Sequence, residues 1–163
     1  MSPEQLDHLR HSAAHMLAAA VLELYPGTKL AIGPTIENGF YYDFKFPEGV
    51  TVSENDFEKI ETKMKSIAKG GHAFVRKEVS VDEAKNFEKD QPFKLELIEE
   101  FAKESKVLTL YESGPFTDLC RGGHAENTSE IPLEGLKLYK LAGAYWRGSE
   151  KNPMLTRVYG LLF

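Results

Sequence analysis

The sequence predicts an α+β fold in which a long central helix is wrapped by a largely antiparallel sheet. Three observations favour this fold class. Apolar residues recur with helical spacing through the first 24 residues, and residues 39–46 alternate as a strand does. Later helices and strands follow one another in mixed order, without strict βαβ alternation. The length of 163 residues fits one domain, and the chain has no internal repeat, low-complexity tract or evident linker.

The first helix is expected from Pro3 to about Leu24. Ser2 can cap its N-terminus, with Gln5 completing a capping box, and Tyr25-Pro26-Gly27 ends it. One apolar stripe contains Leu6, Leu9, Ala13, Met16, Leu17, Ala20 and Leu24. The opposite side carries His8, His11 and His15 among small apolar residues. A helix that is apolar almost all round is typical of a buried position.

The remaining elements follow from alternation and capping signals. In residues 39–46, Phe40, Tyr42, Phe44 and Phe46 share one strand face. Ser53 begins a charged helix to residue 69, and Ser80 with Glu83 forms a capping box for a short helix over residues 80–87. A further helix is expected at 92–104, and further strands at 29–32, 73–79, 107–111, 116–119, 136–144 and 158–163.

Composition excludes several classes of protein. No apolar run approaches the ~20 residues of a membrane-spanning helix, and the N-terminus lacks the layout of a signal peptide. A single cysteine, Cys120, cannot form an internal disulfide, so we expect a protein of the reducing cytoplasm with no membrane partner. The net charge of −5 argues against a polybasic nucleic-acid binder.

Charge is nevertheless uneven along the chain. Residues 136–163 contain five cations and one anion, for a net charge of +4. This end is either a contact for phosphate or an ordinary solvated surface. Trp146, followed by Arg147 and Gly148, either stacks on nucleic acid or lies at the edge of the core.

Histidines and the cysteine form the strongest candidate site. His11 and His15 lie one helical turn apart, and Cys120 and His124 have C-x3-H spacing around two glycines. Such a set suits a tetrahedral zinc ion or a shared pocket, whereas the plain alternative is a small core cysteine beside a turn.

Three further residues carry weaker signals. Asp118, on the strand face of Cys120, either orients a histidine or a water, or is a solvated carboxylate. By pattern alone, Lys94 reads as a solvated lysine of an amphipathic helix and Tyr42 as a core aromatic.

Five stretches together resemble bacterial-type threonyl-tRNA synthetases. They are H-S-A-A-H at 11–15, G-F-Y-Y-D at 39–43, T-D-L-C-R-G-G-H at 117–124, L-A-G-A-Y-W-R-G at 141–148 and N-P-M-L-T-R-V-Y-G at 152–160. Editing domains of alanyl-tRNA synthetases share the H-x3-H and C-x3-H patterns but not the last two stretches. The resemblance implies the fold of the second additional domain of these synthetases. It also implies that residues 1–163 are a single editing domain, dissected or freestanding, without an aminoacylation or anticodon-binding domain.

The resemblance further implies hydrolytic editing of the tRNA for threonine mischarged with serine. A threonine site discriminates weakly against serine, because one methylene contributes only ~1–3 kcal/mol. Expected partners are the aminoacylated 3′ end of this tRNA and the rest of the synthetase. Matching motifs assign catalysis to His11 and Lys94, and substrate binding to His15, Tyr42, Asp118, Cys120 and His124. We expect no required cofactor, with His11, His15, Cys120 and His124 as the candidate zinc ligands.

One position departs from the family. Gly123 stands where many members carry proline, so we expect a more flexible turn between Cys120 and His124.

Three other functions stay open at this point: a zinc-dependent editing protein for the tRNA for alanine, a non-catalytic tRNA-binding module, and a structural zinc domain.

Overall fold

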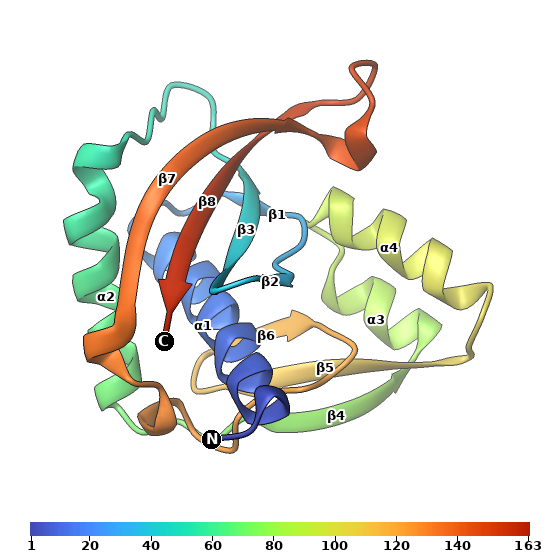
Figure 1. Ribbon diagram of the computed structural model, residues 1–163. Coiled ribbons are helices and arrows are strands. Elements are labelled where there is room, and N and C mark those ends of the chain that lie inside the picture. Colours follow the sequence, from blue (N-terminus) through green and yellow to red (C-terminus); the bar gives the residue numbers. More distant parts are fainter.

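The computed structural model describes residues 1–163 and shows an α+β fold with two antiparallel sheets (Figure 1). The helices are α1 (Pro3–Leu24), α2 (Phe57–Lys69), α3 (Val81–Phe87) and α4 (Pro92–Ala102). The strands are β1 (Lys29–Leu30), β2 (Thr35–Ile36), β3 (Gly39–Lys45), β4 (Val75–Ser80), β5 (Val107–Ser113), β6 (Phe116–Leu119), β7 (Leu136–Tyr145) and β8 (Met154–Leu162). Short 3-10 turns lie at Glu54–Asp56, Thr128–Glu130, Leu133–Gly135 and Trp146–Gly148.

Helix α1 begins with the expected capping box. The Ser2 side chain accepts a hydrogen bond from Gln5 N, and the Gln5 side chain accepts one from Ser2 N. Eleven of its residues are buried, most of them in a 23-residue hydrophobic cluster shared with α2 and the five-stranded sheet. The histidine side of the helix is also covered, because His15 is only 3% exposed. Helix α1 is therefore covered on both sides between Leu9 and Val21, whereas its first turn is exposed to solvent.

The five-stranded sheet has the order β1-β3-β8-β7, with β2 pairing beside β1 on β3. It joins the two ends of the chain, since Tyr42 of β3 lies opposite Val158 of β8. Its inner face carries Phe40 and Phe44, both fully buried, as the alternation predicted. Strands β7 and β8 sweep past α1 as a long curved hairpin (Figure 1).

The segment between β3 and β7 contributes α2 and a second, three-stranded sheet, in the order β4-β5-β6. Helices α3 and α4 pack on this sheet through a small separate core that includes Ala84, Ile98 and Leu110. A third cluster of Ala31, Phe93, Trp146 and Leu155 joins α4 to the five-stranded sheet. Helix α4 therefore touches both sheets.

The structure corrects several expected boundaries. The strands form two sheets instead of one, because pairing within residues 75–119 is local and excludes the rest of the chain. Strand β8 begins at Met154, which pairs with Tyr145 across the hairpin, rather than at residue 158. The helix expected over 53–69 is a 3-10 turn followed by α2. Strand β2 was not predicted, and Ala73 forms only an isolated bridge to Asn127. No helix is long and apolar enough to cross a membrane.

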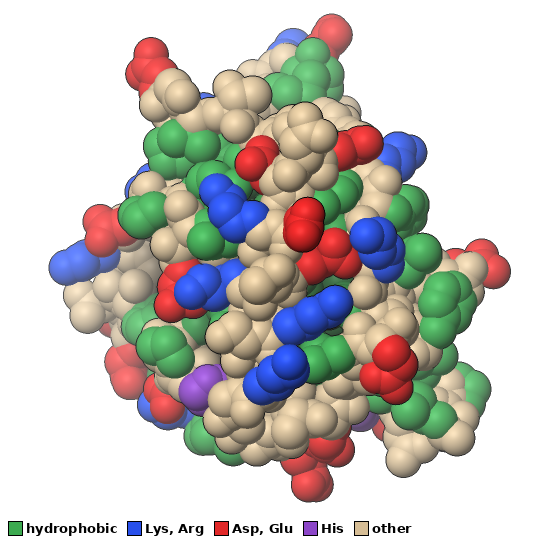
Figure 2. All heavy atoms as spheres, turned by 90° about the vertical axis from the view of Figure 1, so that its left-hand side faces the viewer, with side chains coloured by type: hydrophobic (Ala, Val, Ile, Leu, Met, Phe, Trp, Pro, Cys, Tyr) green, Lys and Arg blue, Asp and Glu red, His purple; other side chains and the backbone are tan.

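Three of the five cations in the basic C-terminal segment pair with acidic residues from elsewhere in the chain. Lys137 Nζ lies 3.6 Å from Glu61 Oε2, and Arg157 Nε lies 2.9 Å from Asp43 Oδ1. Arg147 pairs with Glu100 at 2.8 Å. On the α2 side of the molecule, basic and acidic side chains are interspersed (Figure 2). Lys140 and Lys151 form no ion pair, so the local excess of cations in the sequence is only partly compensated in the structure.

Candidate active site

A cavity of about 480 Å³ collects all seven candidate residues. Helix α1 contributes two of them, β3 and α4 one each, and β6 with the following loop the other three. They are His11, His15, Tyr42, Lys94, Asp118, Cys120 and His124. The wall opposite includes the apolar side chains Ile32, Pro34, Leu97 and Phe101. A concave site where several polar groups converge beside an apolar wall is a candidate binding pocket.

One end of the cavity is centred on Asp118. Tyr42 Oη donates a hydrogen bond of 2.7 Å to Asp118 Oδ2, and Lys94 Nζ lies 2.9 Å from Asp118 Oδ1. Lys94 is 2% exposed and Asp118 is 5% exposed. The contact of Lys94 is ionic rather than an aligned hydrogen bond, and Asp118 Oδ1 has no hydrogen-bond donor. The ammonium therefore keeps N–H groups to offer to a bound molecule.

Burial of a charge pair is costly, because desolvation offsets much of the Coulomb attraction. The sequence pattern alone favoured a solvated lysine at position 94, which the structure shows to be wrong. Tyr42 is buried as the pattern predicted, but its hydroxyl is also a polar contact of the site. Burial and the neighbouring Asp118 carboxylate raise the pKa of Tyr42.

The other end of the cavity holds His11, Cys120 and His124. Cys120 Sγ lies 3.2 Å from His11 Nε2, and the rings of His11 and His124 stack at 4.5 Å. Burial raises the pKa of the Cys120 thiol to about 11, so it stays protonated near neutral pH. Burial also lowers the pKa of His11, although hydrogen bonding to the Gly122 backbone and the charges of Asp7 and Asp118 oppose that shift. His11 is thus a neutral imidazole with a protonated thiol beside it.

His124 is held by Ser12, a residue the sequence reasoning missed. Ser12 Oγ accepts a hydrogen bond from Ala125 N at 2.8 Å and lies 3.2 Å from His124 Nδ1. The hydroxyl has one proton and two acceptor lone pairs, so whether it donates to Nδ1 or accepts from it depends on the tautomer of the neutral ring. His124 Nε2 is buried without a partner. Burial lowers the pKa of His124 to about 2, which keeps the ring neutral.

His15 is placed apart from this cluster. Its Nε2 lies 2.9 Å from Ser113 Oγ of β5, and burial lowers its pKa to about 4. The ligand atoms of His11, Cys120 and His124 lie within 4.8 Å of one another, and His15 is not in that group. The four-residue ligand set expected from spacing is therefore a three-residue set in the structure.

Glu88 is a second residue that the sequence reasoning missed. It follows α3, is 5% exposed, and burial with the charge of Asp118 raises its pKa to about 7, against the opposing charge of Lys94. Its position within the charged run Glu88-Lys89-Asp90 gave no signal of burial.

Glycines shape two walls of the site. A Cβ on Gly33 would lie 2.2 Å from Tyr42 Cδ2, so this backbone passes directly over the tyrosine ring. In the loop after Cys120, Gly122 has φ 119° and Gly123 has φ 82°. Proline fixes φ near −65°, so it could not follow this loop path at position 123. The sequence predicted only a more flexible turn here, whereas the structure shows a backbone conformation that favours glycine.

The three-residue cluster fits a zinc ion as a donor set, since two imidazoles and a thiol leave one tetrahedral position for substrate. The unpartnered His124 Nε2 is consistent with such a ligand. The same atoms also form a self-consistent metal-free arrangement, in which the Cys120 thiol is hydrogen-bonded to His11 Nε2.

Trp146 does not offer a stacking face to nucleic acid. It is 4% exposed and packs against Phe93 with ring centroids 5.1 Å apart. Of the two interpretations of this tryptophan, the structure supports the core-edge position.

Comparison with known proteins gives the site its context. Residues 108–159 match the family model described as the threonyl and alanyl tRNA synthetase second additional domain. The chain is 51% identical over 154 residues to the threonine–tRNA ligase of Borreliella burgdorferi, covering 94% of this chain and 26% of that protein. It is 53% identical over 163 residues to the ligase of Thermotoga neapolitana, covering 99% of this chain and 25% of that protein. It is 52% identical over 158 residues to the ligase of Desulfatibacillum aliphaticivorans, covering 97% of this chain and 24% of that protein. The chain thus spans about a quarter of the length of these relatives.

Proposed function

We propose that this chain is an editing hydrolase. It is homologous to about a quarter of the length of threonine–tRNA ligases, and it matches the model of their second additional domain. It removes serine esterified to the tRNA for threonine. One observation carries the proposal: the neutral His11 imidazole and the buried Lys94–Asp118 pair line the same cavity. Residues 1–163 act as one editing unit, in the cytoplasm, either within a synthetase or in trans to it.

His11 serves as the general base. A water bound near Lys94 displaces the Cys120 thiol from His11 Nε2, attacks the ester carbonyl and transfers its proton to that nitrogen. Burial lowers the pKa of His11 below its ordinary value of 6.5, so the imidazole is mostly unprotonated at pH 7 and ready to accept that proton.

Lys94 stabilises the negative charge that develops on the carbonyl oxygen, because its ammonium is fixed by Asp118 but keeps free N–H groups. Collapse of the tetrahedral intermediate breaks the ester bond. The leaving ribose oxygen takes the proton from His11, which restores the base. Lys94 also polarises the vicinal ribose hydroxyl.

Asp118, Tyr42, His15, Cys120 and His124 bind the serine and shape its pocket. The Asp118 carboxylate attracts the α-ammonium group of the amino acid. Packed rings around His124 leave little freedom for adjustment, since it stacks on Phe74 at 5.0 Å and meets Tyr111 at 4.5 Å. We propose that this rigid wall excludes the extra methyl group of threonine and so makes the site selective for serine.

The proposed reaction requires no metal. The hydrogen-bonded pair of Cys120 and His11 supports this, because a protonated thiol and a neutral imidazole satisfy each other. A second candidate rests on the three-residue cluster: a zinc-dependent editing protein for the tRNA for alanine. There, His11, Cys120 and His124 would hold a zinc ion that acidifies a bound water.

Deacylation assays with three substrates distinguish the candidates. The tRNA for threonine charged with serine should be hydrolysed quickly, the same tRNA charged with threonine slowly, and the tRNA for alanine charged with serine slowly. A chelator should leave the rates unchanged. Preference for the tRNA for alanine with loss of activity on chelation would support the zinc enzyme instead. Tight binding of tRNA without turnover would indicate a binding module.

A further inference from the structure

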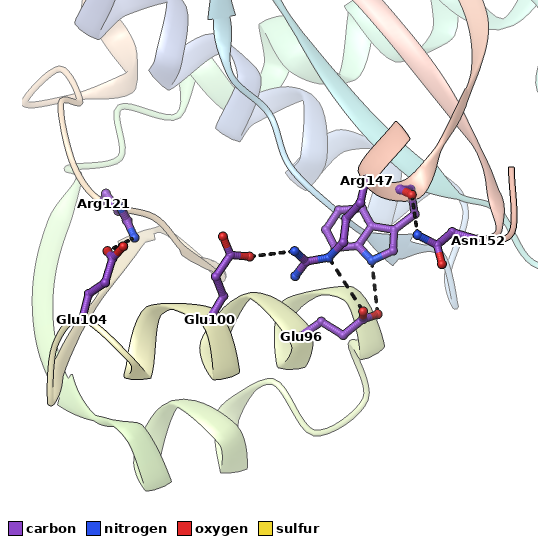
Figure 3. Close-up of polar contacts among 7 residues, drawn as sticks. Glu96, Glu100, Glu104, Arg121, Arg147 and Asn152 are labelled. Atoms are coloured by element: carbon purple, nitrogen blue, oxygen red, sulfur yellow. Dashed lines mark hydrogen bonds and ion pairs between the residues drawn. The ribbon is translucent and has the colours of Figure 1, made fainter. Parts of the chain in front are cut away.

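The hairpin between β7 and β8 ends on α4, the helix that carries Lys94. Trp146 packs on Phe93, the residue next to Lys94, and Trp146 Nε1 donates a hydrogen bond of 3.2 Å to Glu96 Oε2. Arg147 Nη1 donates a hydrogen bond of 2.8 Å to Glu100 Oε2, and Arg147 Nε lies 3.8 Å from Glu96 Oε1. Figure 3 shows the guanidinium of Arg147 directed at both carboxylates, which lie one helical turn apart.

The backbone at this tip is held in an unusual conformation. Arg147 has φ 56° and ψ 23°, in the left-handed region that side chains other than glycine rarely occupy. Such a conformation persists where surrounding contacts over-determine it, and it clusters at functional positions. Asn152 Nδ2 donates a hydrogen bond of 2.7 Å to Trp146 O and closes the loop behind Arg147 (Figure 3). The tip of the hairpin is therefore held in place by hydrogen bonds to α4 and within the loop itself.

Helix α4 depends on contacts of this kind for its placement. Its N-terminus is tied to β1, where Gln91 Oε1 accepts a hydrogen bond from Leu30 N at 2.7 Å. Ile98 anchors it to the three-stranded sheet. Lys94 lies between these two anchors and must meet Asp118 on β6 and the ring of Tyr42 on β3, at 5.4 Å from Nζ. The hairpin is the contact that ties this stretch to β7 and β8 of the sheet that also holds Tyr42.

We propose that Arg147 is a positioning residue for Lys94: its pairing with Glu96 and Glu100 fixes α4 so that Lys94 Nζ is held against Asp118 in the cavity. Arg147 touches neither the cavity nor the reacting atoms. This inference rests on the proposed role of Lys94 in hydrolysis. Exposed ion pairs contribute little to stability, whereas misplacement of a catalytic group by 1 Å costs about a hundredfold in rate. Arg147 therefore acts on rate more than on folding.

The test compares Arg147→Gly with Arg147→Lys. Glycine accepts the left-handed backbone and removes the whole side chain, including the guanidinium, whereas lysine keeps the charge but cannot bridge two carboxylates. Lys77→Ala is the matched control, because it removes a similarly exposed ion pair, that of Lys77 with Glu112 at 2.8 Å, remote from α4. Glu100→Gln weakens the contact of Arg147 with Glu100 from the helix side. It provides a second variant in case Arg147→Gly fails to fold.

Two readouts are needed. The first is the rate at which an amine-specific acylating reagent modifies Lys94, followed by peptide mass spectrometry. The second is kcat and KM for release of serine from the tRNA for threonine. Arg147→Gly should raise the acylation rate of Lys94 severalfold and lower kcat about tenfold, with KM within about twofold of wild type. Arg147→Lys should lie between, Glu100→Gln should resemble Arg147→Gly, and Lys77→Ala should match wild type.

An unchanged acylation rate of Lys94 in Arg147→Gly and Glu100→Gln would overturn the proposal, whatever happens to kcat. A raised KM with unchanged kcat would also overturn it, and would indicate that Arg147 contacts the RNA directly. If the wild-type chain itself releases no serine, the proposed function fails, and the acylation comparison alone decides the placement of Lys94.

Discussion

Lys94 Nζ of α4 lies 2.9 Å from Asp118 Oδ1 of β6, and both side chains are almost completely removed from solvent. The same carboxylate accepts the Tyr42 hydroxyl of the other sheet. Asp118 therefore joins one helix and both sheets at a single point, and a buried ion pair of this kind is a candidate for function more than a source of stability.

Asp118→Asn tests that relationship. The substitution leaves the Lys94 ammonium buried without its partner, so we expect a loss of about 3–5 kcal/mol in the free energy of unfolding and loss of deacylation. Urea unfolding measures the first effect. Glu112→Gln is the control, since it removes an exposed pair with Lys77 and should cost less than about 1 kcal/mol. Equal stability of the two variants would contradict the account of a buried charge pair.

Gly33→Ala tests the close approach of backbone to Tyr42. The new methyl group would lie 2.2 Å from Tyr42 Cδ2, and this ring is 2% exposed and held by the hydrogen bond of its hydroxyl to Asp118. We expect about 1–3 kcal/mol of destabilisation and reduced deacylation, because the Tyr42 hydroxyl leaves Asp118. Gly143→Ala is the matched control, where the nearest atom is the end of the exposed Met154 side chain at 3.0 Å. Similar melting temperatures for the two variants would refute this explanation.

Acidification should destabilise the fold through His15. Its pKa is about 4 in the folded chain and ~6.5 when unfolded, so the unfolded state binds the proton first. The stability it contributes is present above about pH 6.5 and is lost as pH falls toward 4, at up to ~1.4 kcal/mol per pH unit. Glu88, with its raised pKa, acts in the opposite direction over part of this range.

The comparison of wild type with His15→Asn isolates the histidine from Glu88. Urea unfolding at intervals between pH 7 and 4.5 should show a shallower loss of stability in the variant. The same pH dependence in both proteins would mean that the pKa of His15 is the same in the folded and unfolded chain.

The rate of deacylation should also report the state of His11. Because burial lowers its pKa below the ordinary value of 6.5, the base is free at neutral pH. We expect kcat/KM to rise with pH through the acidic range and to level off by about pH 7. Single-turnover rates between pH 5 and 8 measure this. A rate that continues to rise well above pH 7 would exclude His11 as the base.

Much of the local structure was predictable because it depends on neighbouring residues. Ser2 with Gln5 and Ser80 with Glu83 form capping boxes in the structure as the sequence predicts. Alternation in residues 39–46 placed Phe40 and Phe44 on the buried face of β3. The division into two sheets was not predictable in this way, since it depends on which distant strands pair.

The candidate site divides along the same line. Spacing predicted one ligand set of His11, His15, Cys120 and His124, because a helical turn and a tight loop each fix two of these side chains, but the structure leaves His15 out of it. Lys94 and Glu88 carry no local signal, since Lys94 lies in a charged helix and Glu88 in a charged run after α3, and both are nevertheless buried. The resemblance to synthetases supplied Lys94 where the pattern did not.

The central claim is that His11 is the base of a serine-selective hydrolase. The most direct measurement is single-turnover release of serine from the tRNA for threonine by wild type, His11→Ala and His8→Ala. His8 lies one turn earlier on α1 and outside the cavity, so it is the matched control. We predict at least about a hundredfold loss in His11→Ala and wild-type rates in His8→Ala. Equal release by all three proteins would contradict the account.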